Sequence, residues 1–428
     1  MKAEKLKRFI LSGGLDGKLA EIYGEGFETQ RERYAFAVDG FASRYGSSRD
    51  VSLFSVPGRS ELSGNHTDHN HGKVIAASVS VDIIAAAAPS DGPVIRVKSK
   101  GFPEDTVDIS AFAESDPAQF GSSASLIAGC AKGFSDAGLM TGGFDAFTTS
   151  DVLSGSGLSS SAAFEDMIGT ILSHFYNRGK VGYARVAAVS KFAENAFFGK
   201  PCGLMDQMAC AAGGIVAIDF GNPAEPVVEK LGFDLTAAGY RLVIIDTGGS
   251  HADLTADYAS IPAEMKKAAS VFDEEVLRDL PEELFVSHIP EIRAAAGDRA
   301  VLRGLHFYGE NRRVDIQKKA LAENDLPLFL EKVKESGNSS FRYLQNVFSP
   351  AHPSEQGVAL ALCLCERLLS GTRRPSAWRV HGGGFAGTVQ AFVPEEEVEG
   401  FTRWMSAVFG EGSCHLMNIR LAGAVRLI

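Results

Sequence analysis

Apolar positions recur along this chain with two different periods, and together they predict a mixture of strands and helices. Short apolar runs bounded by glycine or proline predict strands, and apolar residues spaced three and four apart predict helices. The predicted strands are 51–56, 74–87, 93–99, 144–153, 213–220, 240–246, 387–393 and 419–428. Helices are predicted within 1–26, at 28–45, 122–137, 158–176, 181–198, 204–212 and 395–410, and through most of 255–370. Pro57 and Gly58 are expected to end the first strand.

The length of the chain predicts two domains. Its 428 residues exceed what one ordinary hydrophobic core holds. Near residue 220 the pattern changes from mixed to mainly helical, with Pro223 and Pro226 close by. We therefore expect domains at 1–220 and 221–428.

Charge and cysteine content narrow the possible partners and compartments. A net charge of -11 gives no long-range attraction to nucleic acid. The apolar stretch 74–89 is interrupted by Ser78, Ser80 and Asp82 and therefore cannot span a membrane, and the N-terminus has no secretory apolar run. The six cysteines are scattered, without a CxxC pair. These features predict a cytoplasmic protein without a nucleic-acid or membrane partner.

The polar stretch GRSELSGNHTDHNHGKV, residues 58–74, allows three interpretations. Three histidines around Asp68 could bind a metal, but Gly64, Gly72 and the neighbouring polar residues favour a loop, in which no regular spacing aligns them. A solvated surface loop is the default for so polar a segment. The third hypothesis is a cluster that binds a small hydroxylated molecule.

A glycine-serine turn, DVLSGSGLSSSAAFEDM at 151–167, lies between a predicted strand and a predicted helix. Gly155 and Gly157 allow the backbone to approach a ligand, and Ser159, Ser160 and Ser161 fall where the helix begins. The free N–H groups of a helix start suit a phosphate. A linker or a simple serine cap are the alternatives. Because no lysine follows the glycines, a triphosphate here would need Mg²⁺ and side chains from elsewhere.

Two further segments carry unusual residues. AENAFFGKPCGLMDQMAC, residues 193–210, places Glu194 and Asp206 in an apolar setting, where a carboxylate usually has a partner or a function. A capping or salt-bridged role is the alternative for each. HGGGFAGTVQAFV, residues 381–393, has three consecutive glycines before a strand, which indicate close backbone approach or simply a structural turn.

Taken together, these four segments resemble the GHMP small-molecule kinases, and within them the galactokinase family. Residues 57–74 are similar to the signature GRVNLIGEHTDYNGG, and LSGSGLSSSAA is similar to the phosphate-binding motif of the family. CGLMDQM is similar to the segment with the catalytic aspartate, and GGGFAGT to the third GHMP motif. The resemblance extends over about residues 28–428. It implies an α+β, two-domain GHMP kinase fold with the active site in the interdomain cleft.

The resemblance also implies a role for each matching residue. Asp206 and Arg59 match the catalytic pair, in which the aspartate accepts or orients the proton of the C1 hydroxyl of the sugar and the arginine keeps the carboxylate ionised. The residues that match sugar-binding positions are Asn65, His66, Asp68, Gly203 and Tyr258. Those that match ATP-binding positions are Gly155, Ser156, Gly157, Leu158, Ser159 and Ser160. Ser161 and Glu194 match the ligands of Mg²⁺.

The chain departs from the family pattern at several positions. Asn65 stands in place of a glutamate that binds a sugar hydroxyl near C6 in the family. His69, His71 and His381 replace a tyrosine, a glycine and a threonine. No Trp-x-Asn-Tyr element precedes the phosphate loop, so the contacts to the adenine are not predicted.

The predicted function is that of a monomeric, ATP- and Mg²⁺-dependent phosphotransferase that phosphorylates the C1 hydroxyl of galactose. One alternative keeps the reaction and changes the sugar to galacturonate, N-acetylgalactosamine or arabinose, because Asn65 removes a negative charge near C6. Another is a non-catalytic sugar sensor on the same fold. A mevalonate or homoserine kinase is disfavoured by GNHTD and CGLMDQM, which carry the galactokinase-like character.

Overall fold

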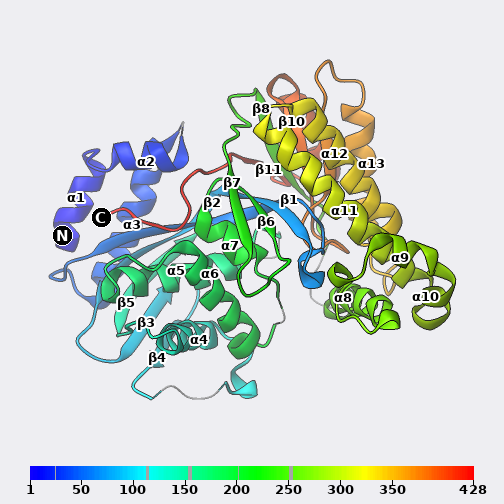
Figure 1. The fold of residues 1–428 in the computed structure, drawn as a ribbon. Helices are drawn as coiled ribbons and strands as arrows, with labels where there is room; N and C mark the ends of the chain where they lie inside the picture. Colours follow the sequence, from blue (N-terminus) through cyan, green and yellow to red (C-terminus); the bar gives the residue numbers. More distant parts are fainter. Residues whose placement is uncertain (25, 112–114, 153–156, 201, 250–253) are drawn as a thin grey trace.

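In the computed structural model of this chain, the described residues are 1–24, 26–111, 115–152, 157–200, 202–249 and 254–428. They form two sheets with helices packed on both faces of each (Figure 1). The larger sheet has the strand order β12-β1-β2-β5-β3-β4, and β6 and β7 extend it from β2. Its strands are β1 (Ser52–Ser63), β2 (Lys73–Pro89), β3 (Val94–Ser99), β4 (Glu104–Asp108), β5 (Phe144–Ser150), β6 (Ile215–Asp219), β7 (Val227–Leu231) and β12 (Val425–Arg426). The pairs are antiparallel except β3 with β5.

Helices cover the larger sheet on both sides (Figure 1). One face carries α1 (Ala3–Leu11), α2 (Asp16–Tyr23) and α3 (Gln30–Tyr45), the last preceded by the short helix η1 (Phe27–Thr29). The other face carries α4 (Ser123–Asp136), α5 (Ser160–Tyr176), α6 (Tyr183–Phe192) and α7 (Met205–Ala212). Along β2, Ile84 and Ala86 pack toward the first set, and Ala85 and Ala87 toward the second. Burial on both faces accounts for the nearly continuous apolar sequence of this strand.

The smaller sheet has the order β11-β8-β10-β9. Its strands are β8 (Tyr240–Asp246), β9 (Ala377–Val380), β10 (Thr388–Pro394) and β11 (Cys414–Met417). One face packs on α13 (Gly357–Leu369) and α14 (Val398–Phe409), and the other on α11 (Asp298–Ala322) and α12 (Leu326–Ser339). A helical cluster of α8 (Thr255–Ala269), α9 (Glu282–Ser287) and α10 (Ile289–Ala296) packs beside α11 (Figure 1).

Short helices complete the described elements. The 3₁₀ turns are η2 (Asp68–Asn70), η3 (Pro117–Gln119), η5 (Ser270–Phe272), η6 (Leu277–Asp279) and η8 (Glu395–Glu397). Two segments are π-helices, η4 (Ala193–Phe198) and η7 (Ser340–Leu344). π-Turns often occur at functional sites, and η4 carries Glu194.

The expected end of the first strand is wrong. β1 continues through Pro57 and Gly58 to Ser63, paired with β2, with bulges between Pro57 and Arg59 and between Glu61 and Ser63. The bulges accommodate the missing N–H of proline, and the long partner strand keeps the backbone extended despite two local breakers. The consequence is functional, because Arg59 and Glu61 stand on a paired strand rather than in a loop.

The expected last strand, 419–428, is also wrong. β11 ends at Met417 in the smaller sheet, and only Val425–Arg426 pairs with β1 in the larger one. The boundary at residue 220 stays a prediction. β7, which follows that position, still pairs with β6 of the larger sheet.

The cysteines and the lengths of the helices can be compared with what the sequence predicts. All six cysteines are free thiols, as the scattered spacing predicts. In the part of the chain that the structure describes, every helix is too short or too polar to cross a membrane.

Candidate active site

Asp206, in the first turn of α7, forms an ion pair with Arg59 of β1. Its Oδ1 accepts hydrogen bonds from Arg59 Nε at 2.8 Å, and its Oδ2 accepts one from the Ser159 hydroxyl at 2.5 Å. Arg59 also donates from Nη1 to the carbonyl of Gly157, and its backbone N–H donates to the carbonyl of Leu158 at 3.1 Å. The predicted catalytic pair is therefore fixed to the end of the predicted phosphate loop.

The surroundings of Asp206 keep its carboxylate ionised. Burial on its own raises the pKa of Asp206, but the Arg59 guanidinium and the Ser159 hydroxyl outweigh it and hold the pKa below its ordinary value. The Arg59 side chain is only 6% exposed, whereas that of Asp206 is 31% exposed. An ionised, partly accessible carboxylate can accept the hydrogen bond and the proton of a hydroxyl group.

The glycine-serine turn joins β5 to α5, as predicted. Gly155 and Ser156 lie outside the described residues. Gly157 has a φ of 73° and Ser159 a φ of 60°, so the backbone turns sharply just before α5 begins at Ser160. The N–H groups in the first turn of a helix have no acceptor within the helix. Those of α5 can therefore donate to a phosphate.

Leu158 is held inside the protein rather than at the surface of this turn. Its side chain is fully buried in the core formed by both sheets. Phosphate binding by residues 157–160 remains a prediction, and for Leu158 only backbone groups are available for it.

The two predicted Mg²⁺ ligands lie in contact. The Ser161 hydroxyl donates to Glu194 Oε1 at 3.1 Å, and the Gln207 amide donates to Glu194 Oε2 at 2.7 Å. Glu194 is 2% exposed. The Nζ of Lys200 lies 2.9 Å from the same Oε1, so this carboxylate already attracts a cation. Hard oxygen donors beside a helix start that is predicted to bind phosphate fit Mg²⁺.

We call residues 64–72 the polar loop and residues 382–384 the glycine segment. Asn65 of the polar loop is fully buried. Its Nδ2 donates to Glu61 Oε1 at 3.0 Å and to the carbonyl of Gly382 at 2.8 Å. Its Oδ1 accepts from Asn346 Nδ2 at 2.8 Å and from the Ser340 hydroxyl at 3.2 Å. Both ends of the amide are thus bonded within the protein, and a contact to sugar stays a prediction.

The backbone of the polar loop is fixed by α11. Glu310 Oε2 accepts from the N–H of Gly64 at 2.9 Å and of Asn65 at 3.3 Å. His306 Nε2 lies 2.9 Å from the carbonyl of Asn65. Both side chains are fully buried. These hydrogen bonds hold the backbone of the polar loop against α11.

His66 keeps one ring nitrogen that can accept a hydrogen bond, and its contact to a sugar stays a prediction. Its Nε2 lies 2.9 Å from the carbonyl of Gly383, and because a carbonyl can only accept, Nε2 carries the hydrogen. Burial lowers the pKa of His66 to about 4, so the ring is neutral at physiological pH and Nδ1 keeps its lone pair. A neutral acceptor suits a sugar hydroxyl.

Three side chains approach the backbone of the glycine segment closely. The carbonyl of Gly382 accepts from Asn65, that of Gly383 contacts His66, and that of Gly384 accepts from Tyr258 at 3.1 Å. A Cβ on Gly383 would lie 2.4 Å from the ring of Tyr258. Close approach, one of the two interpretations from the sequence, is thus correct, and it brings Tyr258 to the polar loop.

Gly203 lies directly against Asp68, and its replacement by alanine should damage sugar binding. A Cβ at Gly203 would lie 1.8 Å from Asp68 Oδ2, so the carboxylate would have to move. A displacement of about 1 Å in a positioned group costs on the order of 100-fold in catalytic efficiency. We expect Gly203→Ala to lower kcat/KM for the sugar by that amount and to leave KM for ATP unchanged in steady-state assays.

Gly232→Ala is the matched control, because a Cβ there meets no atom within 4 Å. It should behave as the unmodified protein. Equal sugar kinetics in the two variants would show that the contact of Gly203 with Asp68 has no functional role.

The histidines of the polar loop do not form a metal centre with their neighbours. His69 Nε2 lies 3.9 Å from Asp68 Oδ1, and within the described ranges no group of three or more His, Cys, Asp or Glu side chains is arranged to hold a metal ion. His66 and His71 have φ values of 58° and 59°. The backbone is therefore left-handed at both residues, unlike in a strand or a right-handed helix.

Sequence reasoning missed four residues of this site. They are Glu61, Lys200, Asn346 and Arg379. Glu61 lies within the polar stretch, two residues after Arg59 on the same strand, and this spacing was the available signal. The other three have no local signature, since their positions depend on the packing of distant elements.

Comparison with known proteins places the chain in a family. Residues 39–89 match the galactokinase galactose-binding signature, and residues 125–214 match the N-terminal domain of GHMP kinases. A galactokinase of Streptomyces coelicolor is 28% identical over 397 residues, 91% of this chain and 97% of that protein. A galactokinase of Actinobacillus pleuropneumoniae is 30% identical over 375 residues, 86% of this chain and 91% of that protein.

Solved structures show the same fold. The structure of Lactococcus lactis galactokinase complexed with galactose superposes with a TM-score of 0.77 at 23% identity, covering 92% of this chain and 99% of that one. A mevalonate kinase superposes with a TM-score of 0.60 at 14% identity, covering 86% and 99%.

Two helix-covered sheets, with an Asp-Arg pair beside a glycine-serine helix start, define a small-molecule kinase of the GHMP class. The predicted α+β fold is confirmed. Within this class, the chain belongs to the galactokinase family. Membership of a kinase family implies the use of ATP.

Proposed function

We propose that this chain transfers the γ-phosphoryl group of ATP to the C1 hydroxyl of galactose, giving galactose 1-phosphate and ADP. The observation that carries the proposal is the ionised Asp206, held by Arg59 and Ser159 at the start of α5. The polar loop connects β1, the strand that carries Arg59, to β2. Within this loop, Asp68 lies against Gly203. The acceptor hydroxyl would therefore meet the phosphate where the carboxylate can receive its proton.

The reaction needs positioning and charge compensation more than covalent chemistry. The C1 hydroxyl oxygen forms the new bond to the γ-phosphorus, and its proton passes to Asp206. The bond between the γ-phosphorus and its bridging oxygen breaks, and ADP leaves. Arg59 stabilises the negative charge around the carboxylate and the phosphoryl group. Mg²⁺, bound with ATP, would be held by Ser161 and Glu194 and would neutralise phosphate charge.

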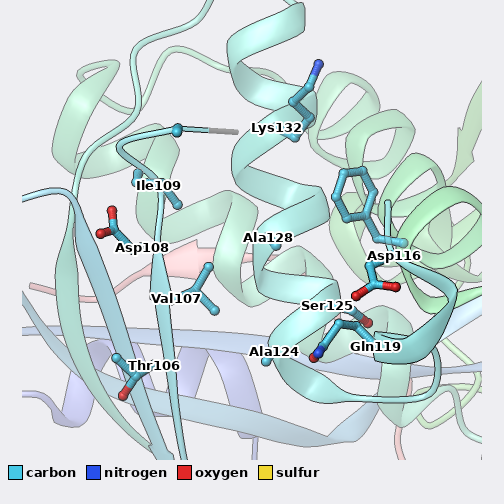
Figure 2. A pocket seen from close by; sticks show the side chains of 12 residues that line it. Thr106, Val107, Asp108, Ile109, Asp116, Gln119, Ala124, Ser125, Ala128 and Lys132 are labelled. Atoms are coloured by element: carbon cyan, nitrogen blue, oxygen red, sulfur yellow. The ribbon is translucent and has the colours of Figure 1, made fainter. Parts of the chain in front are cut away.

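A cavity between β4 and α4 is our proposal for the base of ATP. Its volume is about 330 Å³, within the range of small-molecule sites. Figure 2 shows Val107 and Ile109 on the strand side and Ala124 and Ala128 on the helix side. Phe197, which also lines it, belongs to η4, the π-helix that carries Glu194. Apolar residues and one phenyl ring would thus replace the aromatic element absent from the sequence, and Asp108, Asp116, Gln119 and Lys132 add polar groups to the same lining.

The assembled catalytic pair favours an enzyme over a non-catalytic sugar sensor. A sensor would be expected to lose part of the predicted catalytic arrangement, and the contacts of Arg59 with Asp206 and of Ser161 with Glu194 support an enzyme instead. We further propose that the enzyme acts as a cytoplasmic monomer, in keeping with its free thiols.

An ADP-release assay with Mg·ATP tests the proposal. Galactose, galacturonate, N-acetylgalactosamine, arabinose and glucose are compared at equal concentrations. We expect galactose to give the highest kcat/KM. Preference for galacturonate would assign the chain to an acidic sugar, and sugar binding by calorimetry without turnover on any sugar would support the sensor.

A further inference from the structure

Glu61 lies at the centre of a buried network that joins the two sheets. Its Oε1 accepts from Arg379 Nη2 at 2.6 Å and from Asn65 Nδ2 at 3.0 Å. Its backbone carbonyl accepts from Gln390 Nε2 at 2.6 Å. Glu61 is 3% exposed and Arg379 is fully buried. The first belongs to β1 of the larger sheet, and Arg379 and Gln390 belong to β9 and β10 of the smaller one.

The signature GRVNLIGEHTDYNGG has its asparagine at the position of Glu61 and its glutamate at the position of Asn65. In this chain the two residue types are exchanged. The structure shows that the exchanged side chains touch. The exchange is therefore reciprocal: the site keeps one carboxylate and one amide, and the carboxylate has moved by four residues along the chain.

We propose that Glu61 and Asn65 act as one positioning unit that fixes the polar loop against the glycine segment, and that Glu61 supplies the negative charge that position 65 lacks. This inference rests on the proposed sugar kinase function and deepens it. We expect the site still to disfavour an acidic sugar, because the Glu61 carboxylate lies one hydrogen bond away from Asn65, with its charge partly balanced by Arg379.

The contacts explain why each residue depends on the other. Arg379 has its ion pair with Glu61, so Glu61→Asn leaves a fully buried guanidinium without that carboxylate. Asn65→Glu would place a second carboxylate about one hydrogen-bond length from the first, with like charges in a buried setting. The double exchange, Glu61→Asn with Asn65→Glu, restores one carboxylate and one amide.

Burial raises the pKa of Glu61 above its ordinary value, and the guanidinium groups of Arg379 and Arg59 offset only part of this rise. Charge and shape at Glu61 must therefore be tested separately. Glu61→Gln keeps the shape and the hydrogen-bonding length of the side chain and removes its charge.

The first experiment compares the unmodified protein, the two single variants and the double variant. Each single variant should raise KM for galactose at least about tenfold, which corresponds to about 1.4 kcal/mol, with KM for ATP nearly unchanged. The double variant should recover most of this loss if the two residues are coupled. If they acted independently, the two losses would add instead. Glu229→Asn is the matched control, because Glu229 is 49% exposed in its ion pair with Lys318 and should have no effect.

The second experiment measures the ratio of kcat/KM for galactose to that for galacturonate in Glu61→Gln. The ratio should fall by about tenfold or more if the carboxylate repels acidic sugars. An unchanged ratio overturns the charge assignment, and strictly additive losses in the double variant overturn the positioning unit.

Thermal unfolding of the same four proteins separates this inference from the proposed function. If no sugar is turned over, the proposed function fails, yet recovery of the unfolding midpoint in the double variant would still show that the two residues are coupled. Additive shifts of the midpoint would overturn the coupling without any reference to sugar.

Discussion

Replacing Asp206 by asparagine is expected to lower kcat for galactose between about 100-fold and about 10,000-fold, the usual contribution of a positioned proton acceptor. Asparagine preserves the size of the side chain, and its one amide oxygen can still accept from Arg59, while its NH2 group faces the Ser159 hydroxyl, which can turn to accept. It cannot accept a proton from the sugar hydroxyl. KM for ATP and the affinity for galactose, measured by calorimetry, should change little, because the change acts on the transition state.

Asp219→Asn provides the matched control for this variant. Its side chain is also 31% exposed and pairs with an arginine, Arg278, at 3.0 Å, but it lies at the end of β6. It should retain full kcat. If Asp206→Asn kept kcat within a few fold of the unmodified protein, Asp206 would not be the proton acceptor, and the role of Arg59 would need reassignment.

The sequence predicts the fold class and the pairing of Asp206 with Arg59 better than it predicts the extent of individual strands. Asp206 and Arg59 were predictable because their neighbours follow motifs with fixed chemistry, and the structure joins them at hydrogen-bond distance. The extent of β1 was not predictable, because Pro57 and Gly58 break strands locally and only the long pairing with β2 overrides them. Local propensity carries no information about that partner.

Short strands escaped prediction for a related reason. β4, β7 and β9 have only four or five residues each, and β4 and β7 carry charged side chains at exposed positions. Their apolar content is too small to give a period. They form because a neighbouring strand offers an edge, which is a property of the sheet rather than of the segment.

The support of the polar loop was beyond local analysis too. α11 is rich in charged residues, and such a helix is usually expected at a surface. Yet Arg303, His306 and Glu310 on it are buried, and two of them bond the backbone of the polar loop. The sequence alone does not distinguish a charged residue that is buried against a distant loop from one that is exposed to solvent.

Replacing Asp82 by asparagine is expected to lower the free energy of unfolding by about 3–5 kcal/mol, the usual cost of breaking a buried ion pair from one side. Asp82, on β2, is fully buried and accepts from Arg33 at 2.5 Å, from Arg420 at 2.8 Å and from the Tyr23 hydroxyl at 2.6 Å. The variant leaves the buried Arg420 guanidinium short of a counter-charge, and among the described residues Arg33 keeps only its ion pair with the exposed Asp151 at 3.1 Å. Urea unfolding followed by circular dichroism measures the loss.

The pH dependence of unfolding supplies an independent check on Asp82. Burial raises the pKa of its carboxyl, but Arg33 and Arg420 outweigh this and hold it below the ordinary value. A folded-state pKa below the unfolded one, about 3.9, means that the stabilisation is present above that pH and is lost as pH falls through the folded pKa. The asparagine variant should lack this part of the acid sensitivity.

Asp39→Asn, which removes an exposed partner of Lys7, should change stability by less than about 1 kcal/mol. Overlapping unfolding curves for Asp82→Asn and Asp39→Asn would contradict the buried-charge account. The contacts of Asp82 reach α2, α3 and the segment after β11 at once. A large loss would therefore show that this buried cluster, which joins the first helices and the C-terminal segment to the sheet that carries Arg59, contributes to stability.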